Sequence, residues 1–198
     1  LIKNESFSDT MKPEDFGLSS QLQFFKSKEV GSASVTSTTI HKCDNFSLCL
    51  FFLPSNAIIP LHDHPGMTVF SKLLLGTVHI KSYDWVIQPH GNGDRLHPYA
   101  KLIVDGNFTA QCSTSVLFPT SGGNIHQFKA ITPCAILDVI GPPYSGKDGR
   151  DCSYYKDILL HSSKDGDEQF AILEEIGMPE DSQMNLIEYL GPQLMNTD

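Results

Sequence analysis

Short, strand-length apolar segments recur along the middle of the chain and alternate with clusters of turn-forming residues. FSLCLFFL at 46–53 and CAILDVI at 134–140 are two of these segments, and PSN, PHGNGD and PTSGGN are three of the clusters between them. Many short strands at close spacing, without amphipathic segments of helix length, are typical of an all-β sandwich or barrel. The pattern therefore predicts an all-β fold.

The same pattern divides the chain into three parts of a single domain covering residues 1–198. Residues 1–35 form a polar arm with a short helix expected at about 13–26, residues 36–144 form the barrel core, and residues 145–198 form a C-terminal extension. Within the core, the stretch at 87–100 is too long and too polar for a tight turn, which predicts a disordered loop or a lid over one end of the barrel.

Composition narrows the classes of protein that fit. The formal charge of −9 argues against a general nucleic-acid binder, which would need a basic face, and suits a substrate that carries positive charge. No apolar run approaches the roughly 20 residues that span a membrane. Five scattered cysteines, with no CxxC pair, fit a reducing compartment better than a disulfide scaffold, so a cytoplasmic or nuclear location is expected. The chain begins with Leu1, so we expect it to be a fragment of a longer product.

Two histidines stand one residue apart in the stretch PLHDHPGMTVF at 60–70. In a strand, residues i and i+2 point to the same face, so His62 and His64 would aim both imidazoles at one point while Asp63 faces away. A polar turn is the alternative interpretation, and the spacing alone does not decide between the two. The pair lies at the mouth of a predicted barrel strand, where small barrels hold ligands.

A third histidine, His126, follows the glycine turn in SGGNIHQF at the start of another predicted strand. The two glycines permit unusual backbone dihedrals and close approach, so the turn can set this histidine against a neighbouring strand. Three neutral imidazoles suit iron, zinc, copper or nickel without choosing among them. Three protein ligands leave coordination positions open, as in catalytic metal sites. With no carboxylate at a convincing further position, the metal would favour an anionic ligand such as a thiolate.

The remaining histidines are interpreted as structural or solvated. His79, for example, lies between Val78 and Ile80, and strand alternation turns it away from these apolar neighbours toward solvent.

Three blocks of the sequence, PLHDHPGMTVFSKLLLGTVHIKSYDW, GGNIHQFKAITPCAILDVIGPPYS and DCSYY, strongly resemble the plant cysteine oxidases. These are thiol dioxygenases, grouped with the animal 2-aminoethanethiol (cysteamine) dioxygenases. The resemblance implies a cupin fold, a double-stranded β-helix or jelly-roll barrel, that binds Fe(II) through His62, His64 and His126. Cupins in general carry a glutamate shortly after the histidine pair, whereas this chain has PGMTVF there, as thiol dioxygenases do.

The reaction that the resemblance implies is the O2-dependent oxidation of a thiol to a sulfinic acid, with both oxygen atoms placed on sulfur. In the plant family the substrate is the N-terminal cysteine of proteins, notably ethylene-response transcription factors. The oxidised residue feeds N-degron proteolysis, so the enzyme senses oxygen in hypoxia. We expect a monomer that binds neither nucleic acid nor membranes. The alternatives are a dioxygenase of small free thiols, such as cysteamine or cysteine, and a non-catalytic metal-binding cupin module.

Position and resemblance together add two candidate catalytic residues. Asp138 lies in the apolar strand CAILDVI, where a carboxylate is usually paired or functional. It would hydrogen-bond a ligand histidine or attract the ammonium group of the substrate. Tyr144, at the end of GPPY, would place a phenol near the mouth of the pocket, with a packed turn tyrosine as the alternative.

A cysteine–tyrosine crosslink is not predicted, although some thiol dioxygenases carry one near iron. Cys152 and Tyr154 stand only two residues apart and are interpreted as an ordinary pair. Four further residues of the family-like blocks are left outside the predicted site: Lys72, Tyr83, Asp84 and Trp85.

Overall fold

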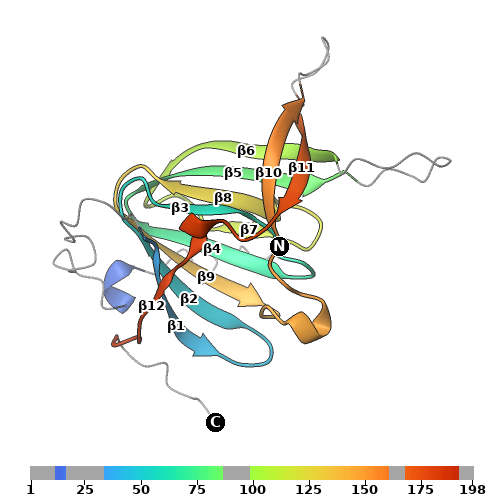
Figure 1. The fold of residues 1–198 in the computed structure, drawn as a ribbon. Coiled ribbons are helices and arrows are strands. Elements are labelled where there is room, and N and C mark those ends of the chain that lie inside the picture. The colour runs from blue at the N-terminus through green and yellow to red at the C-terminus, as the bar shows by residue number, and fades with distance from the viewer. Residues whose placement is uncertain (1–11, 17–33, 87–98, 161–167, 192–198) are drawn as a thin grey trace, which may run out of the picture.

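The computed structural model describes residues 12–16, 34–86, 99–160 and 168–191, and strands make up most of these ranges (Figure 1). The strands, in chain order, are β1 (Thr36–Lys42), β2 (Ser47–Leu53), β3 (Ile58–His62), β4 (Thr68–Leu75), β5 (Thr77–Trp85), β6 (Tyr99–Thr109), β7 (Ser115–Leu117), β8 (Ile125–Ala130), β9 (Cys134–Gly141), β10 (Tyr154–Leu160), β11 (Phe170–Ile176) and β12 (Asn185–Leu186). The short 3-10 helices are η2 (Pro13–Phe16), η4 (Gly146–Asp148) and η5 (Glu180–Ser182). The predicted all-β class is confirmed.

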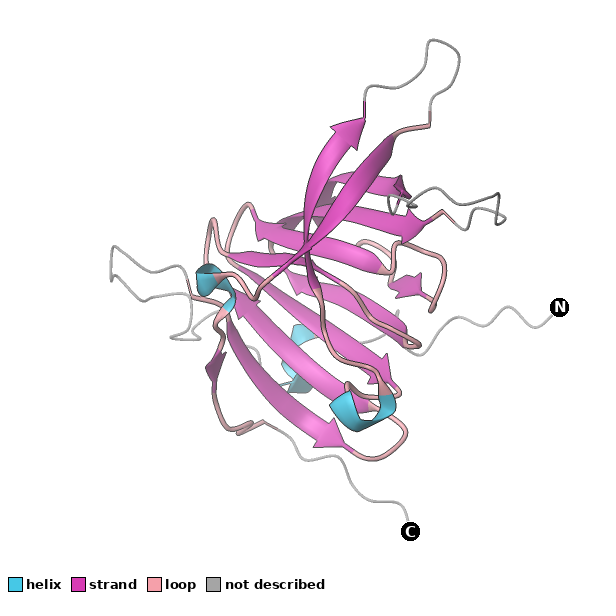
Figure 2. Ribbon diagram, turned by 45° about the vertical axis from the view of Figure 1, so that its right-hand side comes forward, coloured by secondary structure: helices cyan, strands magenta, loops and turns pink. Residues whose placement is uncertain are grey.

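The strands form two layers that face each other across the core (Figures 1 and 2). One sheet has the order β12-β1-β2-β9-β4-β7, and the other closes on itself in the order β10-β11-β6-β5-β8-β3. The closing contact pairs Tyr154 of β10 with His62 of β3. Two facing sheets linked by long crossovers are the jelly-roll layout of the predicted double-stranded β-helix. The layout places His62 and His126 on adjacent strands of the second sheet, and His64 lies in the loop that follows β3.

An apolar core fills the space between the two layers. Leu73 on β4 and Ile136 on β9 face Val78 on β5 and Phe128 on β8, and all four are buried. Fully burying a side chain of this size contributes about 1.5–3 kcal/mol. Because β5 alternates, the residues next to Val78 point to the opposite side of their sheet.

The C-terminal extension supplies the hairpin β10–β11, which crosses the other strands of the second sheet in both views (Figures 1 and 2). One face of the hairpin packs against these strands. A second buried cluster forms there from Leu61, Tyr83, Ala100, Ile125, Ala171 and Leu173. The division at residue 144 thus separates two parts of one fold, because the extension completes the closed barrel.

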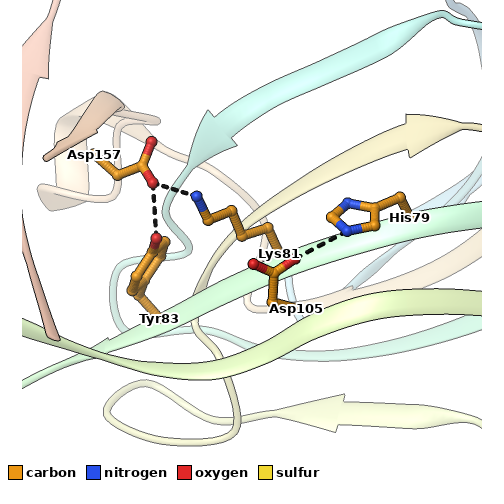
Figure 3. Close-up of polar contacts among 5 residues, drawn as sticks. All are labelled: His79, Lys81, Tyr83, Asp105 and Asp157. Atoms are coloured by element: carbon orange, nitrogen blue, oxygen red, sulfur yellow. Dashed lines mark hydrogen bonds and ion pairs between the residues drawn. The ribbon is translucent and has the colours of Figure 1, made fainter. Parts of the chain in front are cut away.

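A polar network at the edge of this second cluster fastens the hairpin to β5 (Figure 3). Asp157 of β10 accepts hydrogen bonds from Lys81 Nζ at 2.5 Å and from the Tyr83 hydroxyl at 2.8 Å. Next to it, His79 lies 2.9 Å from Asp105 at the surface. The prediction that His79 faces away from the core is confirmed.

The predicted N-terminal helix and the predicted lid are described only in part. Within the expected helix at 13–26, the structure has the 3-10 helix Pro13–Phe16, and residues 17–33 lie outside the described residues. Residues 87–98 of the predicted lid lie outside them as well. All five cysteines are free. Among the described residues, no helix is long and apolar enough to cross a membrane.

Candidate metal centre

The three predicted histidines converge between the sheets. His62 ends β3, His64 follows two residues later, and His126 is the second residue of β8, directly opposite His62 in the strand pairing. Their ring centroids lie 5.0, 4.8 and 4.9 Å apart, and the nitrogen atoms able to bind a metal all lie within 4.8 Å of one another. The chain therefore places three imidazoles around one point.

Burial keeps these imidazoles neutral. It is the largest cause lowering the pKa of His62, and it holds the pKa values of His64 and His126 well below the ordinary value, with a further lowering from the neighbouring histidines. A metal ligand must be a neutral imidazole, because a protonated ring has no free lone pair. The site is thus ready to bind a cation near neutral pH.

Hydrogen bonds fix which nitrogen of each ring faces inward. His62 Nδ1 lies 2.8 Å from the Pro60 carbonyl, which can only accept, so Nδ1 carries the proton and Nε2 keeps its lone pair. The Tyr144 hydroxyl donates to the Asp63 carbonyl at 2.7 Å, so at 2.9 Å from His64 Nδ1 it must accept. The ring of His126 is held by the backbone of Gly123. Such contacts orient metal-binding histidines and fix their tautomers.

The inward nitrogens are left without partners in the protein. The Nε2 atoms of His64 and His126 are buried and have no hydrogen-bond partner among the described residues. Burying an unpaired polar atom costs free energy, so a cluster of such atoms needs an explanation. A metal ion bound by the three histidines supplies one, and the residues fit that group.

No carboxylate joins the three histidines in the described part of the chain. Asp63 points away, as predicted, and accepts hydrogen bonds from the Ser153 backbone N–H at 2.8 Å and the Tyr155 hydroxyl at 3.1 Å. The cluster therefore leaves the charge of a bound metal to be balanced by other ligands.

The glycine turn before β8 has the role that the sequence predicts. Gly122 and Gly123 both have φ of +84°. A Cβ atom would lie 2.7 Å from the Val116 carbonyl oxygen at Gly122 and 2.4 Å from Ser82 Oγ at Gly123. Only glycine fits these two positions, which lead directly to His126.

Asn124, which follows these glycines, ties the two halves of the centre together and was missed in the sequence. Its buried side chain accepts from the His64 N–H at 3.1 Å and donates to the His64 carbonyl at 2.9 Å. Asp84, which was left outside the predicted site, accepts from the N–H groups of Gly123 and Asn124, both at 2.9 Å. We call the two hydrogen bonds between Asn124 and the His64 backbone the Asn124 clamp. No short motif contains Asn124 and Asp84 together, so the sequence offered no signal for it.

Asp138 is buried on the inward face of β9, beside Ser71 of the neighbouring strand β4. Burial is the main cause that raises its pKa to about 7, and a hydrogen bond with Ser71 partly offsets this. Among the described residues, its Oδ1 atom has no hydrogen-bond partner, and no hydrogen bond connects Asp138 to a ligand histidine. Of its two predicted roles, the attraction of an ammonium group stays a prediction.

Tyr144 stands against the ring of His64, with ring centroids 5.3 Å apart. Its position near the mouth of the pocket and its catalytic role stay predictions. Cys152 lies beside Tyr144. Burial raises the pKa of the Cys152 thiol, and hydrogen bonds with Tyr144 and Tyr154 partly offset the rise. Tyr154 also stands beside His62, at 6.4 Å between centroids. The interpretation of Cys152 and Tyr154 as an ordinary pair stays a prediction.

A cavity of about 170 Å³ begins at His126 and extends between the two sheets. Near the histidine it is lined by Ser71 and Ser82, and beyond them by an apolar group of side chains. Ser113, Ser115 and Gly122 line the end that reaches the surface, where all three are exposed. Tyr144 and Tyr154 stand against the other two ligands, and in the described part of the chain this cavity is an approach to the metal centre.

The chain is similar to several known proteins. The PCO_ADO family model matches residues 7–194. Plant cysteine oxidase 2 of Arabidopsis thaliana is 50% identical over 198 residues, covering 94% of this chain and 71% of the relative. The 2-aminoethanethiol dioxygenase of Homo sapiens is 33% identical over 175 residues, covering 79% of this chain and 64% of the relative. A solved RmlC-like cupin protein from Desulfovibrio desulfuricans is 17% identical, with a TM-score of 0.40, covering 59% of this chain and 92% of that one.

Proposed function

The chain belongs to the PCO_ADO family, and from that premise we propose that it is an iron-dependent dioxygenase that oxidises the N-terminal cysteine of target proteins to cysteine sulfinic acid. The observation that carries the proposal is the convergence of three neutral, buried imidazoles, two of which, His64 and His126, have Nε2 atoms without a hydrogen-bond partner among the described residues. Plant cysteine oxidases 1 and 2 of Arabidopsis thaliana, at 45% and 50% identity, support the choice of a cysteine thiol.

Iron bound by His62, His64 and His126 would supply the redox chemistry that lets O2 react with a thiolate. A site without a carboxylate ligand suits this task, because the retained positive charge attracts the anionic sulfur. Other residues of the chain hold the ligand histidine His64 in place for this metal. Tyr144 holds the ring of His64, and the Asn124 clamp holds its backbone.

Asp138 is proposed to receive the ammonium group of the substrate's N-terminus. Its Oδ1 atom is buried and unpaired, and its neighbours Ser71 and Ile136 both line the cavity. A nearby cation would favour the ionised carboxylate and lower the pKa of Asp138 from its value of about 7. The polypeptide beyond its first residue would then leave through the exposed polar end of the cavity.

The small-thiol alternative differs in what the cavity must bind. Free cysteine carries a carboxylate, and none of the described side chains that line the cavity is positively charged. Free cysteine therefore lacks a partner here, whereas a peptide substrate has no carboxylate at that position. Cysteamine lacks the carboxylate as well, so a direct comparison with peptides is needed.

The wider role proposed is oxygen sensing. Ethylene-response transcription factors are the proposed targets, and the oxidised N-terminus would enter N-degron proteolysis in the cytoplasm or the nucleus. Oxidation to a sulfinic acid is not readily reversed, which suits a mark that commits a protein to degradation.

Oxygen uptake by the Fe(II)-loaded protein tests the substrate class. We expect uptake with a peptide that begins with cysteine, much slower uptake with the same peptide N-acetylated, and weaker use of free cysteine and cysteamine at equal concentration. The acetylated peptide is the matched control, because it keeps the thiol and loses the ammonium group. Faster uptake with cysteamine than with the peptide would favour the small-thiol alternative. No uptake with any thiol by the iron-loaded protein would leave only the non-catalytic module.

A further inference from the structure

Along β4, β5, β6, β8 and β9 the cavity is lined by apolar side chains together with Ser71, Ser82 and His126. We call the apolar group the apolar floor, and it consists of Leu73, Val78, Ile80, Val104, Phe108, Phe128 and Ile136. Its residues come from both sheets. Four of them are buried, and Ile80, Val104 and Phe108 are half-buried.

An N-terminal cysteine has no group that suits this floor. Its ammonium and peptide groups would lose their hydrogen bonds with water and find no replacement among apolar side chains, which is costly. Its polypeptide must also continue outward from the metal centre. A small apolar molecule meets no such cost, because it gives up no hydrogen bonds. Cavities of this kind stay dry and accept apolar atoms such as xenon.

Gly106 keeps the space over the floor free. It lies on β6 between Val104 and Phe108, both of which line the floor, and strand alternation puts all three on one face. A Cβ atom built at Gly106 would meet no heavy atom within 4 Å. Its backbone does not require glycine, since its φ lies outside the left-handed region. A glycine inside a strand weakens it and often marks a place that a ligand approaches.

We propose that the apolar floor is a binding compartment for dioxygen, from which the gas reaches the metal centre past His126. The inference rests on the proposed function for the identity of the gas. The existence of an apolar gas site in the barrel does not depend on it. The compartment lies on the cavity side of the histidines, which is also the side left open by Tyr144 and Tyr154. Dioxygen and thiol would therefore occupy different parts of one cavity.

Two substitutions fill the floor and one matched substitution does not. Gly106→Leu and Val104→Phe add carbon atoms on the inward face of β6. Asn107→Leu adds the same side chain as the first variant on the exposed, outward face of the same strand. None of the three residues belongs to the metal centre. Val104→Phe fills the same space from a second position, so the test does not depend on Gly106→Leu folding correctly.

The first test is xenon binding to crystals of the metal-free protein under xenon pressure. We expect xenon in the apolar floor of the wild type and of Asn107→Leu, and its loss in Gly106→Leu and Val104→Phe. Absence of xenon from the wild-type floor would overturn the proposal without involving any activity.

The second test is the Michaelis constant for O2, measured at saturating N-terminal-cysteine peptide with the Fe(II)-loaded variants. The filled variants should show a several-fold higher KM for O2, with unchanged KM for the peptide and unchanged iron content, while Asn107→Leu should match the wild type. A raised KM for the peptide with an unchanged KM for O2 would show that the floor holds the substrate, which overturns the proposal. Xenon binding without thiol-dependent O2 uptake would support the gas compartment and overturn the proposed function.

Discussion

Tyr144 acts on the metal centre through a single hydroxyl group. The group accepts a hydrogen bond from His64 Nδ1 and donates one to the Asp63 carbonyl, so it fixes both the tautomer and the tilt of the ring. The ring of Tyr144 also packs beside the buried cluster of Met67, Val69, Leu117 and Ile140, which phenylalanine can retain. The hydroxyl can therefore be removed with little loss of packing.

We expect Tyr144→Phe to weaken metal binding by about 10–100-fold, the usual cost of losing a hydrogen bond behind a ligand histidine. Competition with a chelator for Fe(II) or Co(II) measures the change. Tyr155→Phe is the matched control, because it also removes a hydroxyl that contacts Asp63 but touches no ligand histidine. Equal metal affinity in Tyr144→Phe and the wild type would show that the hydroxyl does not orient His64.

Asp138 makes the fold less stable at neutral and alkaline pH. Its pKa is about 7 in the folded protein, against 3.8 for an unperturbed aspartate, so between these values the unfolded chain loses a proton that the folded chain retains. Rising pH therefore lowers the free energy of unfolding through this window. A residue kept at such a cost is a candidate for function rather than for stability.

Asp138→Asn should accordingly stabilise the metal-free protein at pH 8, by up to about 4 kcal/mol, and the gain should shrink as the pH falls toward 4. Urea denaturation at several pH values measures the difference. The same variant should lose turnover of N-terminal-cysteine peptides if the carboxylate receives their ammonium group. A variant that is less stable than the wild type at pH 8 would contradict the burial argument.

At the residue scale, the sequence predicts the metal-binding histidines better than it predicts the residues that hold them in place. The histidine spacing and the glycine turn carry a local signal, and both His62–His64 and His126 stand where this signal places them. Asn124 and Asp84 carry none, because their roles arise only when distant residues meet in the fold: Asn124 and His64 are 60 positions apart, and Asp84 and Asn124 are 40 positions apart. The choice of iron came from resemblance, since three imidazoles alone do not select a metal.

At the scale of elements, the half-buried carboxylate of Asp157 ties the hairpin β10–β11 to β5. Burial alone would raise the pKa of Asp157, but hydrogen bonds from Lys81 and Tyr83 outweigh it, so the pKa lies below the ordinary value (Figure 3). The ionised carboxylate thus stabilises the hairpin above the unperturbed pKa, and this contribution is lost in acid.

Asp157→Ala should cost about 1–2 kcal/mol in the free energy of unfolding, because it leaves Lys81 and Tyr83 without their acceptor. Amide hydrogen exchange should become faster in β10 and β11 before other strands. Asp105→Ala is the matched control, because it removes a carboxylate that lies next to this network. Its carboxylate pairs with His79 at the surface, where such a pair contributes about 0–1 kcal/mol. Equal effects of the two substitutions would contradict a special role for Asp157.

The core strands follow from periodicity, whereas β10 was not anticipated. Its segment YYKDILL contains half-buried and exposed residues and no buried one, which reflects packing on one face only. That face is covered by residues of β5, β6 and β8, which a single sequence does not place beside it. The barrel could be predicted from local pattern, but the closure of its second sheet by the extension could not.

At the scale of the whole molecule, the two facing sheets bring together ligands that stand 64 positions apart in the chain, since His62 and His126 are direct partners across β3 and β8. Tyrosines stand against two of the ligands, and a cavity opens on the third. Among the described residues, this cavity offers an approach for both thiol and gas. The central claim is that the metal centre reached in this way transfers both atoms of O2 to one sulfur atom.

Mass spectrometry of an N-terminal-cysteine peptide, after incubation with the Fe(II)-loaded protein under labelled O2, tests that claim most directly. We predict a product carrying two labelled oxygen atoms on its first residue, and none with His126→Ala, which should also fail to retain iron. A peptide left unchanged by the iron-loaded wild type, or one that gains a single labelled oxygen, would contradict the account.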